Sequence, residues 1–98
     1  TSLNNLAELH SVQGHYRKAE KLYLQSLEMT KRTLGQDHPT YAVCLSNLAI
    51  LYARQSRFGK ATALLEQALT KQLRTLGQSH PETERTRQSL VNIKAAMH

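Results

Sequence analysis

The sequence predicts an all-α fold: a solenoid of two helix-turn-helix repeats followed by a C-terminal capping helix. Residues 3–39, laid without a gap over residues 45–81, are identical at 18 of 37 positions, so the chain repeats every 42 residues. Leucine and alanine recur at helical spacing in both copies, and a Leu-Gly-Gln-x-His-Pro segment ends each one. A fixed period of this size is typical of stacked helical units, which act mainly by presenting an extended surface.

The first repeat contains two predicted helices. A leucine stripe with i, i+3 spacing predicts a helix over about residues 2–13, which Gly14 ends. The second helix is expected from Tyr16 to about Leu34. Gly35 follows it, and glycine adopts the left-handed conformation of a helix C-terminus at low cost.

The second repeat has the same layout, with helices expected over about residues 39–55 and 58–76. Pro39 opens the first of them, at a position where its missing N–H would have no helical partner in any case. Asp37 or His38 is placed to cap this helix, and a carboxylate there also complements the positive helix end.

A fifth helix, expected over about residues 81–97, begins a third copy that is more polar than the others. Arg87 stands where the repeats carry leucine, and Glu82 and Glu84 lie on the first turns. A polar last unit is what a helical stack needs where stacking ends. The predicted organisation is one domain over residues 1–98 of a longer protein: repeat one at about 1–38, repeat two at about 39–80 and the capping helix at about 81–97.

Composition narrows the class of protein. The chain has 98 residues, a net charge of +6 and one cysteine, Cys44, which excludes an internal disulfide and implies no oxidising compartment. Neither a signal peptide nor an apolar run long enough to span a membrane is visible. We therefore expect a cytoplasmic protein that does not use a membrane as its partner.

The positive charge is spread along the chain, which favours a solvated outer surface. Nucleic acid, the alternative ligand for basic side chains on the second helix of each repeat, is unlikely. Binding of single strands normally adds aromatic stacking platforms, and Tyr16, Tyr23, Tyr52 and Phe58 are expected to pack in the interior.

The helix pairs resemble tetratricopeptide repeats. In the first repeat the matching residues are Leu6, Ala7, His10, Gly14, Tyr16, Ala19, Tyr23 and Ser26. In the second they are Leu48, Ala49, Tyr52, Ser56, Phe58, Ala61, Leu65 and Ala68. The 42-residue period exceeds the usual tetratricopeptide period of about 34 residues. The longer repeat unit, with its Leu-Gly-x-x-His-Pro corner and its Asn-Leu-Ala segment, is similar to the repeats of kinesin light chains. His10, Ser26 and Ser56 depart from the usual aromatic residue, alanine and glycine.

The resemblance implies a protein–protein interaction module, a scaffold or adaptor that binds a peptide in a concave groove. The first helix of each pair (the A helix) would line that groove. The candidate groove residues are Asn4, Asn5, Glu8, Val12, Val43, Ser46, Asn47, Ile50, Arg54, Arg85, Gln88, Ser89 and Asn92. Asn5 and Asn47 occupy one equivalent site, and an asparagine ladder can bond a peptide backbone with both donors and acceptors.

Charge in the predicted groove bears on the kind of peptide. Some tetratricopeptide domains clamp a C-terminal carboxylate with lysine, arginine and asparagine, but Asn4 and Glu8 replace the lysine and an asparagine of that arrangement here. The Glu8 side chain would repel the C-terminal carboxylate of a peptide, so this mode of binding is disfavoured. Arg54, Arg85 and Arg87 still make one side basic, which is compatible with an acidic peptide.

Enzymatic or metal chemistry is not expected, and neither is a cofactor. The chain lacks a phosphate-binding glycine loop and a Ser-His-Asp pattern, and His10 and His15 do not have the i, i+4 spacing of a helical zinc pair. His38 and His80 recur one repeat apart and are expected to bond backbone groups at the His-Pro corner. Cys44 is expected to act as a small buried hydrophobe.

Self-association is the structural alternative. Two repeats are fewer than the three or more that usually make a stable array. The surface of the first helix that would face a preceding unit is expected to be apolar, so a homodimer or a helix swap is the competing hypothesis.

Overall fold

The computed structural model describes residues 3–97, which form five α-helices and no strand. The helices are α1 (Leu3–Val12), α2 (Tyr16–Thr33), α3 (Pro39–Arg54), α4 (Phe58–Thr75) and α5 (Pro81–Ala96). Each predicted helix is present, and its bounds agree with the prediction to within one residue. Residue 2, where the first helix was expected to begin, lies outside the described residues.

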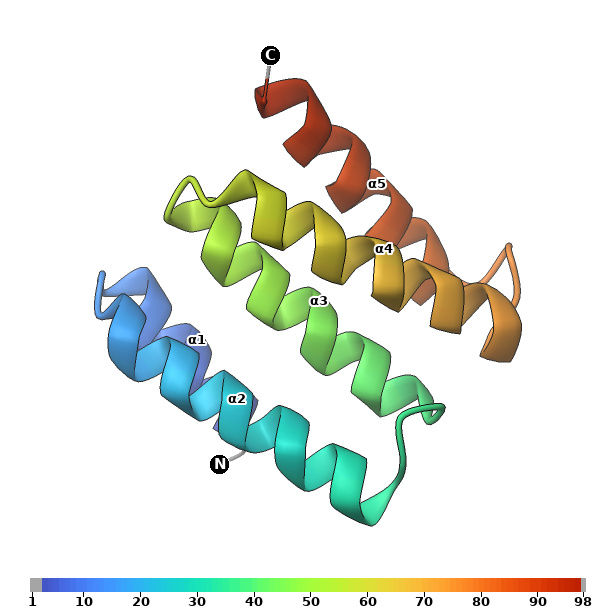
Figure 1. The fold of residues 1–98 in the computed structure, drawn as a ribbon, viewed down its shortest axis with the longest axis horizontal. Helices are drawn as coiled ribbons and strands as arrows, with labels where there is room; N and C mark the ends of the chain where they lie inside the picture. The colour runs from blue at the N-terminus through green and yellow to red at the C-terminus, as the bar shows by residue number, and fades with distance from the viewer. Residues whose placement is uncertain (1–2, 98) are drawn as a thin grey trace.

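The helices stack in chain order. α1 and α2 form one antiparallel pair, which we call unit one, and α3 and α4 form unit two. Figure 1 shows α3 lying between α2 and α4, with α5 beyond α4. Because α3 contacts the second helix of its own unit and that of the preceding unit, it is the most buried helix. This arrangement is the predicted all-α stack with a terminal fifth helix.

The interior is built from leucine, tyrosine and alanine at the predicted positions. Ala7, Ala19, Ala49 and Ala61 are fully buried, which lets neighbouring helix axes approach closely. The main cluster around these alanines is completed by Tyr23, Leu48, Leu51, Tyr52, Leu65 and Leu90. Burying one such large apolar side chain contributes about 1.5–3 kcal/mol, so this cluster is the main source of stability.

The two His-Pro corners work as predicted. The Nδ1 atom of His38 accepts a hydrogen bond from the backbone N–H of Thr40 at 3.1 Å, and His80 does the same for Glu82 at 3.1 Å. Each histidine is therefore the side-chain N-cap of the helix that follows it, with proline at the first helical position. Asp37 lies 3.9 Å from the Lys71 ammonium instead, so His38 is the cap.

The turns rely on backbone conformations that favour glycine. Gly35 has a φ of 93° and donates its N–H to the Thr30 carbonyl, which ends α2. Between α3 and α4 the equivalent of Gly14 is Ser56, which holds a φ of 61° although it has a side chain. The turn survives this substitution at a cost in backbone strain.

One side of α1 is apolar and open, as expected for the surface that would face a preceding unit. The side chains of Leu6 and Leu9 are 38% and 51% exposed, against 3% and 1% for their equivalents Leu48 and Leu51. The physical reason is position in the stack. α2 covers Leu48 and Leu51, whereas within residues 3–97 no helix lies over the corresponding side of α1.

Candidate functional site

The predicted groove residues lie on α1, α3 and α5, the A helices, which contact one another in that order. The side of the stack that these helices form is called the A-helix face below. α2 and α4 form the opposite side. The A-helix face therefore combines side chains from both units and from α5, as a surface for an extended ligand requires.

An ion pair joins two predicted groove residues across the units. The guanidinium of Arg54 on α3 lies 3.1 Å from the Glu8 carboxylate on α1, and it also donates to the Ser11 hydroxyl. The Tyr23 hydroxyl donates to the other oxygen of Glu8 at 3.0 Å. These contacts fix α1 relative to α3, so the A-helix face is preorganised there.

The same contacts shift two ionisation equilibria. Hydrogen bonding to Arg54 is the main cause that lowers the pKa of Glu8, and partial burial opposes it. Burial and the bond to Glu8 raise the pKa of Tyr23 well above its ordinary value. Glu8 is therefore ionised and Tyr23 neutral at physiological pH. Ser11 and Tyr23 were not predicted as part of this site, because their bonds join different helices and depend on how those helices pack.

Two further predicted groove residues connect adjacent A helices. The Asn4 amide donates to the Cys44 thiol at 3.9 Å, and the Ser46 hydroxyl lies 3.5 Å from the hydroxyl of Thr86. Asn4 and Ser46 are equivalent in the 42-residue repeat, and so are Cys44 and Thr86. A polar contact between the same repeat positions thus recurs at both A-helix junctions. The side chains of Asn4 and Ser46 therefore connect neighbouring A helices.

The two equivalent asparagines have different surroundings. Asn5 is exposed on α1, whereas Asn47 is half-buried on α3. Among the described residues, the Asn47 amide has no hydrogen-bond partner. An amide with donors and acceptors available and part of its surface open can bond a peptide backbone without first breaking a bond in the protein.

A shallow pocket of about 290 Å³ lies between α3 and α5. Its lining residues are Ile50, Ala53, Arg54, Ser89, Asn92 and Ile93. Four of these, Ile50, Arg54, Ser89 and Asn92, were predicted groove residues, so the structure brings them together. An apolar floor with a few polar groups at the rim is typical of small binding sites. Ile93 was not among the predicted groove residues; it stands at the repeat position of the buried Leu51.

The remaining candidates do not line this pocket. On α5 the Gln88 amide donates to Asn92 at 3.0 Å, and Arg85 pairs with Glu82 at 3.5 Å. Arg87 pairs with Glu84 at 3.0 Å. Arg54, Arg85 and Arg87 are therefore each matched by a glutamate. Val12 is 63% exposed at the end of α1, and its equivalent, Arg54, points back towards the preceding unit.

Over residues 3–97 no group of three or more potential metal ligands occurs. The rings of His10 and His15 lie beside each other, with centroids 5.8 Å apart. Cys44 is buried against Ser26 and Thr30. In the same part of the chain no helix is long and apolar enough to cross a membrane.

Several basic side chains on or next to α4 contact other residues of the stack. Lys71 and Arg74 lie 3.9 and 4.0 Å from the Asp37 carboxylate. Arg57 and Lys60 lie over the Tyr52 ring, at 5.6 and 5.4 Å from its centroid. Two of these cations contact the loop between α2 and α3, and the other two contact a ring within unit two.

Comparisons with known proteins agree with this architecture. The tetratricopeptide repeat family matches residues 1–74, and no curated protein matches the chain. The fold is similar to the crystal structure of a Podosopora anserina putative kinesin light chain with nearly identical TPR-like repeats: the TM-score is 0.86, the identity is 26%, and the match covers 96% of this chain. A variant of that protein matches equally well. Each match covers 44% of the solved chain, so this chain spans less than half the length of those relatives. The family match and the five stacked helices together show that this chain belongs to the tetratricopeptide repeat family.

Proposed function

We propose that this chain is a scaffold or adaptor module that binds a peptide segment of a partner protein on its A-helix face. Tetratricopeptide repeats generally mediate protein–protein interaction and are typically non-enzymatic. The observation that carries the proposal is the pocket between α3 and α5, which joins apolar Ile50 and Ile93 to polar Arg54 and Asn92. We further propose that the protein acts in the cytoplasm.

In this proposal an extended peptide crosses the A helices and places one apolar side chain in the pocket. Its backbone bonds Asn47, whose amide has no partner among the described residues. Because the bond between Glu8 and Arg54 already holds α1 against α3, binding orders little of the receptor. Arg54 is already paired with Glu8, so an acidic residue of the peptide would have to displace Glu8. The apolar residue and the backbone bond to Asn47 therefore supply most of the proposed affinity.

A selection from a random peptide library, with the chain as bait, tests this proposal. The dissociation constant of a selected peptide is then measured by fluorescence anisotropy for the natural chain and for N47A. We expect N47A to weaken binding about 5- to 10-fold, the effect of losing one hydrogen bond worth about 1 kcal/mol. The melting temperature should be unchanged, since Asn47 makes no hydrogen bond with the residues that the structure describes.

Leu24→Glu is the matched control, because Leu24 is exposed on α2 and Glu66 is the natural residue at the equivalent site of α4. L24E should bind the peptide as the natural chain does. A peptide lost with L24E and kept with N47A would place the binding site on the opposite side of the stack and contradict the proposal.

A further inference from the structure

Among residues 3–97, every lysine and arginine on the A helices is paired with a carboxylate. α1 carries neither residue type, Arg54 is the one on α3, and α5 carries Arg85, Arg87 and Lys94. Their cationic groups lie between 3.0 and 3.8 Å from a glutamate oxygen. The net charge of +6 therefore leaves no unpaired lysine or arginine on the described A helices.

Arg54 is the cation that borders the proposed peptide site, and it is held towards α1. One guanidinium nitrogen lies 3.1 Å from one Glu8 oxygen, and the other lies 3.5 Å from the second oxygen. The latter nitrogen also donates to the Ser11 hydroxyl, and Tyr23 donates to Glu8 at 3.0 Å. A two-pronged contact between a guanidinium and a carboxylate fixes geometry as well as adding energy, so both groups have a defined position.

The 42-residue repeat relates this contact to the pocket. Ile50 and Ala53, which line the pocket between α3 and α5, are the equivalents of the two α1 residues that Arg54 contacts. The equivalent of Arg54 on α5 is Ala96. The positions that hold an arginine and its polar partners between α1 and α3 are therefore apolar between α3 and α5, where the pocket is open.

An acidic peptide gains little from Arg54. Arg54 lines the pocket and also contacts Glu8, so a peptide carboxylate beside the pocket reaches it only by displacing the Glu8 carboxylate. Such an exchange breaks one charge-assisted pair for each one that it forms. The displaced carboxylate then lies next to the peptide acid, and like charges at close range repel. An acid next to the apolar residue of the peptide therefore does not strengthen binding.

We propose that Glu8 sets the charge preference of this site, so that it selects peptides with no acid next to the residue that enters the pocket. The inference rests on the proposed function, because it concerns the same site. Glu8 does not line the pocket, and in this role it is a positioning residue that acts through Arg54. The selectivity comes from a group that repels the wrong ligand, which is one of the two ways in which a site discriminates.

A matched pair of peptides tests this proposal. Alanine scanning of a peptide selected with the natural chain identifies the apolar residue that contributes most to binding. One peptide then carries aspartate beside that residue, and the other carries asparagine, which is uncharged. Fluorescence anisotropy gives both dissociation constants, and the readout is the ratio of the aspartate value to the asparagine value. A purely structural change in the protein would alter both constants and leave this ratio as it was.

Glu8→Gln is the informative variant, because glutamine removes the charge and keeps an oxygen that can accept from Tyr23 and Arg54. The natural chain should bind the aspartate peptide no more tightly than the asparagine peptide. In E8Q the ratio should fall about 2- to 5-fold, the usual effect of one ion pair between exposed side chains. Adding Arg54→Gln to E8Q should restore the ratio, since the cation that the acid contacts is then absent.

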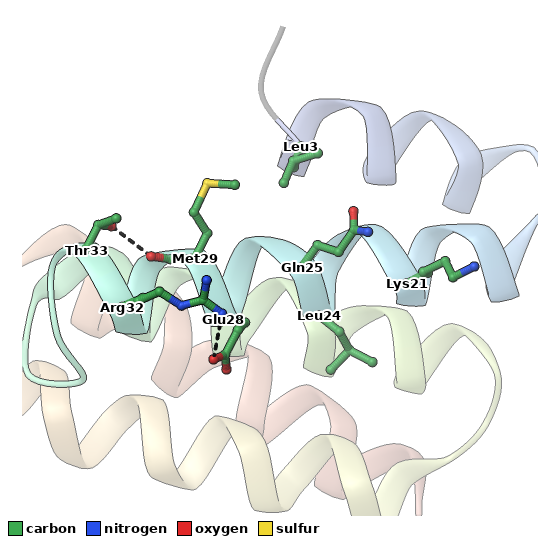
Figure 2. Close-up of a pocket in the computed structure, with 8 residues that line it drawn as sticks. All are labelled: Leu3, Lys21, Leu24, Gln25, Glu28, Met29, Arg32 and Thr33. Atoms are coloured by element: carbon green, nitrogen blue, oxygen red, sulfur yellow. Dashed lines mark hydrogen bonds and ion pairs between the residues drawn. The ribbon is translucent and has the colours of Figure 1, made fainter.

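Glu28→Gln is the matched control. It makes the same change in net charge and also releases an arginine, because Glu28 lies 3.4 Å from Arg32. Figure 2 shows this pair on α2, which lies on the opposite side of the stack from the A-helix face. E28Q should have the ratio of the natural chain. Circular dichroism checks that each variant is helical, and the comparison of E8Q with E28Q decides alone if the double variant does not fold.

Four results would overturn the proposal. The first is a natural chain that prefers the aspartate peptide, and the second is an unchanged ratio in folded E8Q. The third is an equal fall in E28Q, which would indicate a general attraction to positive charge, and the fourth is a fall that persists in folded E8Q/R54Q. In all four the peptide still binds, so the proposed function stands. A natural chain that selects no peptide contradicts the proposed function and this inference together.

Discussion

The Glu8 carboxylate on α1 lies 3.1 Å from the Arg54 guanidinium on α3, across a sequence separation of 46 residues. The pair ties unit one to unit two on the A-helix face, and Tyr23 and Ser11 complete its hydrogen bonding. Both charged side chains keep contact with water, so their attraction is screened. The pair therefore sets geometry more than it adds stability, and the balance between these roles can be measured.

Replacing Glu8 with glutamine should make the free energy of unfolding depend less on pH in the acidic range. Because Arg54 lowers the pKa of Glu8 in the folded state, the pair stabilises the fold fully above pH 4.5 and loses its effect as the pH falls through the folded-state pKa. We expect E8Q to cost about 0.5 kcal/mol at pH 7. Urea denaturation at pH 7 and pH 3 measures this, and a difference that is no smaller at pH 3 than at pH 7 would contradict it.

Tyr52→Phe should weaken the fold and change its response to alkali. The Tyr52 hydroxyl donates to Glu20 at 2.7 Å, and losing this bond should cost about 1 kcal/mol. Burial raises the pKa of Tyr52 to about 12 from the ordinary value of 10, so its contribution is complete below pH 10 and is lost as the pH rises through 12.

Thermal unfolding at pH 9 and pH 11 compares Y52F with the natural chain. Tyr23 titrates in both proteins, so the difference between them reports on Tyr52. Y52F should lose less stability between the two pH values. An equal loss would mean that Tyr52 does not resist ionisation in the folded chain.

Equivalent leucines should differ in their contribution to stability. Leu51 is 1% exposed and Leu9 is 51% exposed, although they occupy the same repeat position. Leu51→Ala should cost about 2–5 kcal/mol because it leaves a cavity, while Leu9→Ala should cost less than about 1 kcal/mol.

Urea denaturation of L51A and L9A at the same low protein concentration measures the free energy of unfolding of each variant. Equal losses for the two variants would show that Leu9 is covered in solution.

Ser56→Gly should stabilise the turn between α3 and α4. Ser56 has a φ of 61°, a region that costs a residue with a side chain about 1–2 kcal/mol. Glycine relieves this cost but is more flexible when unfolded, by about 0.5–1 kcal/mol. We therefore expect a net gain of about 0.5 kcal/mol in the free energy of unfolding.

The reciprocal change, Gly14→Ser in unit one, is the control for S56G. Gly14 has a φ of 83°, and a Cβ atom there would meet no atom within 4 Å, so any loss comes from the backbone alone. Chemical denaturation should show G14S destabilised and S56G stabilised. A stabilised G14S would contradict the strain argument.

The sequence by itself determined the helices, their ends and the His-Pro corners. These features depend on contacts between residues a few positions apart: the leucine spacing along one helix, Gly35 at its end, and His38 two residues before the N–H that it caps. The groove residues were assigned to the A helices through the resemblance to tetratricopeptide repeats; the helical period by itself shows only that they fall outside the leucine stripes.

Only the tertiary structure decided which of these side chains are free. Asn4 and Ser46 bond across A-helix junctions, Glu8 and Arg54 bond each other, and Asn47 keeps its amide open among the described residues. These partners lie on different helices, about 40 residues or more away, and their distance depends on how the helices stack. Likewise, identical leucines are buried in α3 and exposed in α1, because burial depends on the neighbouring helix and not on the residue itself.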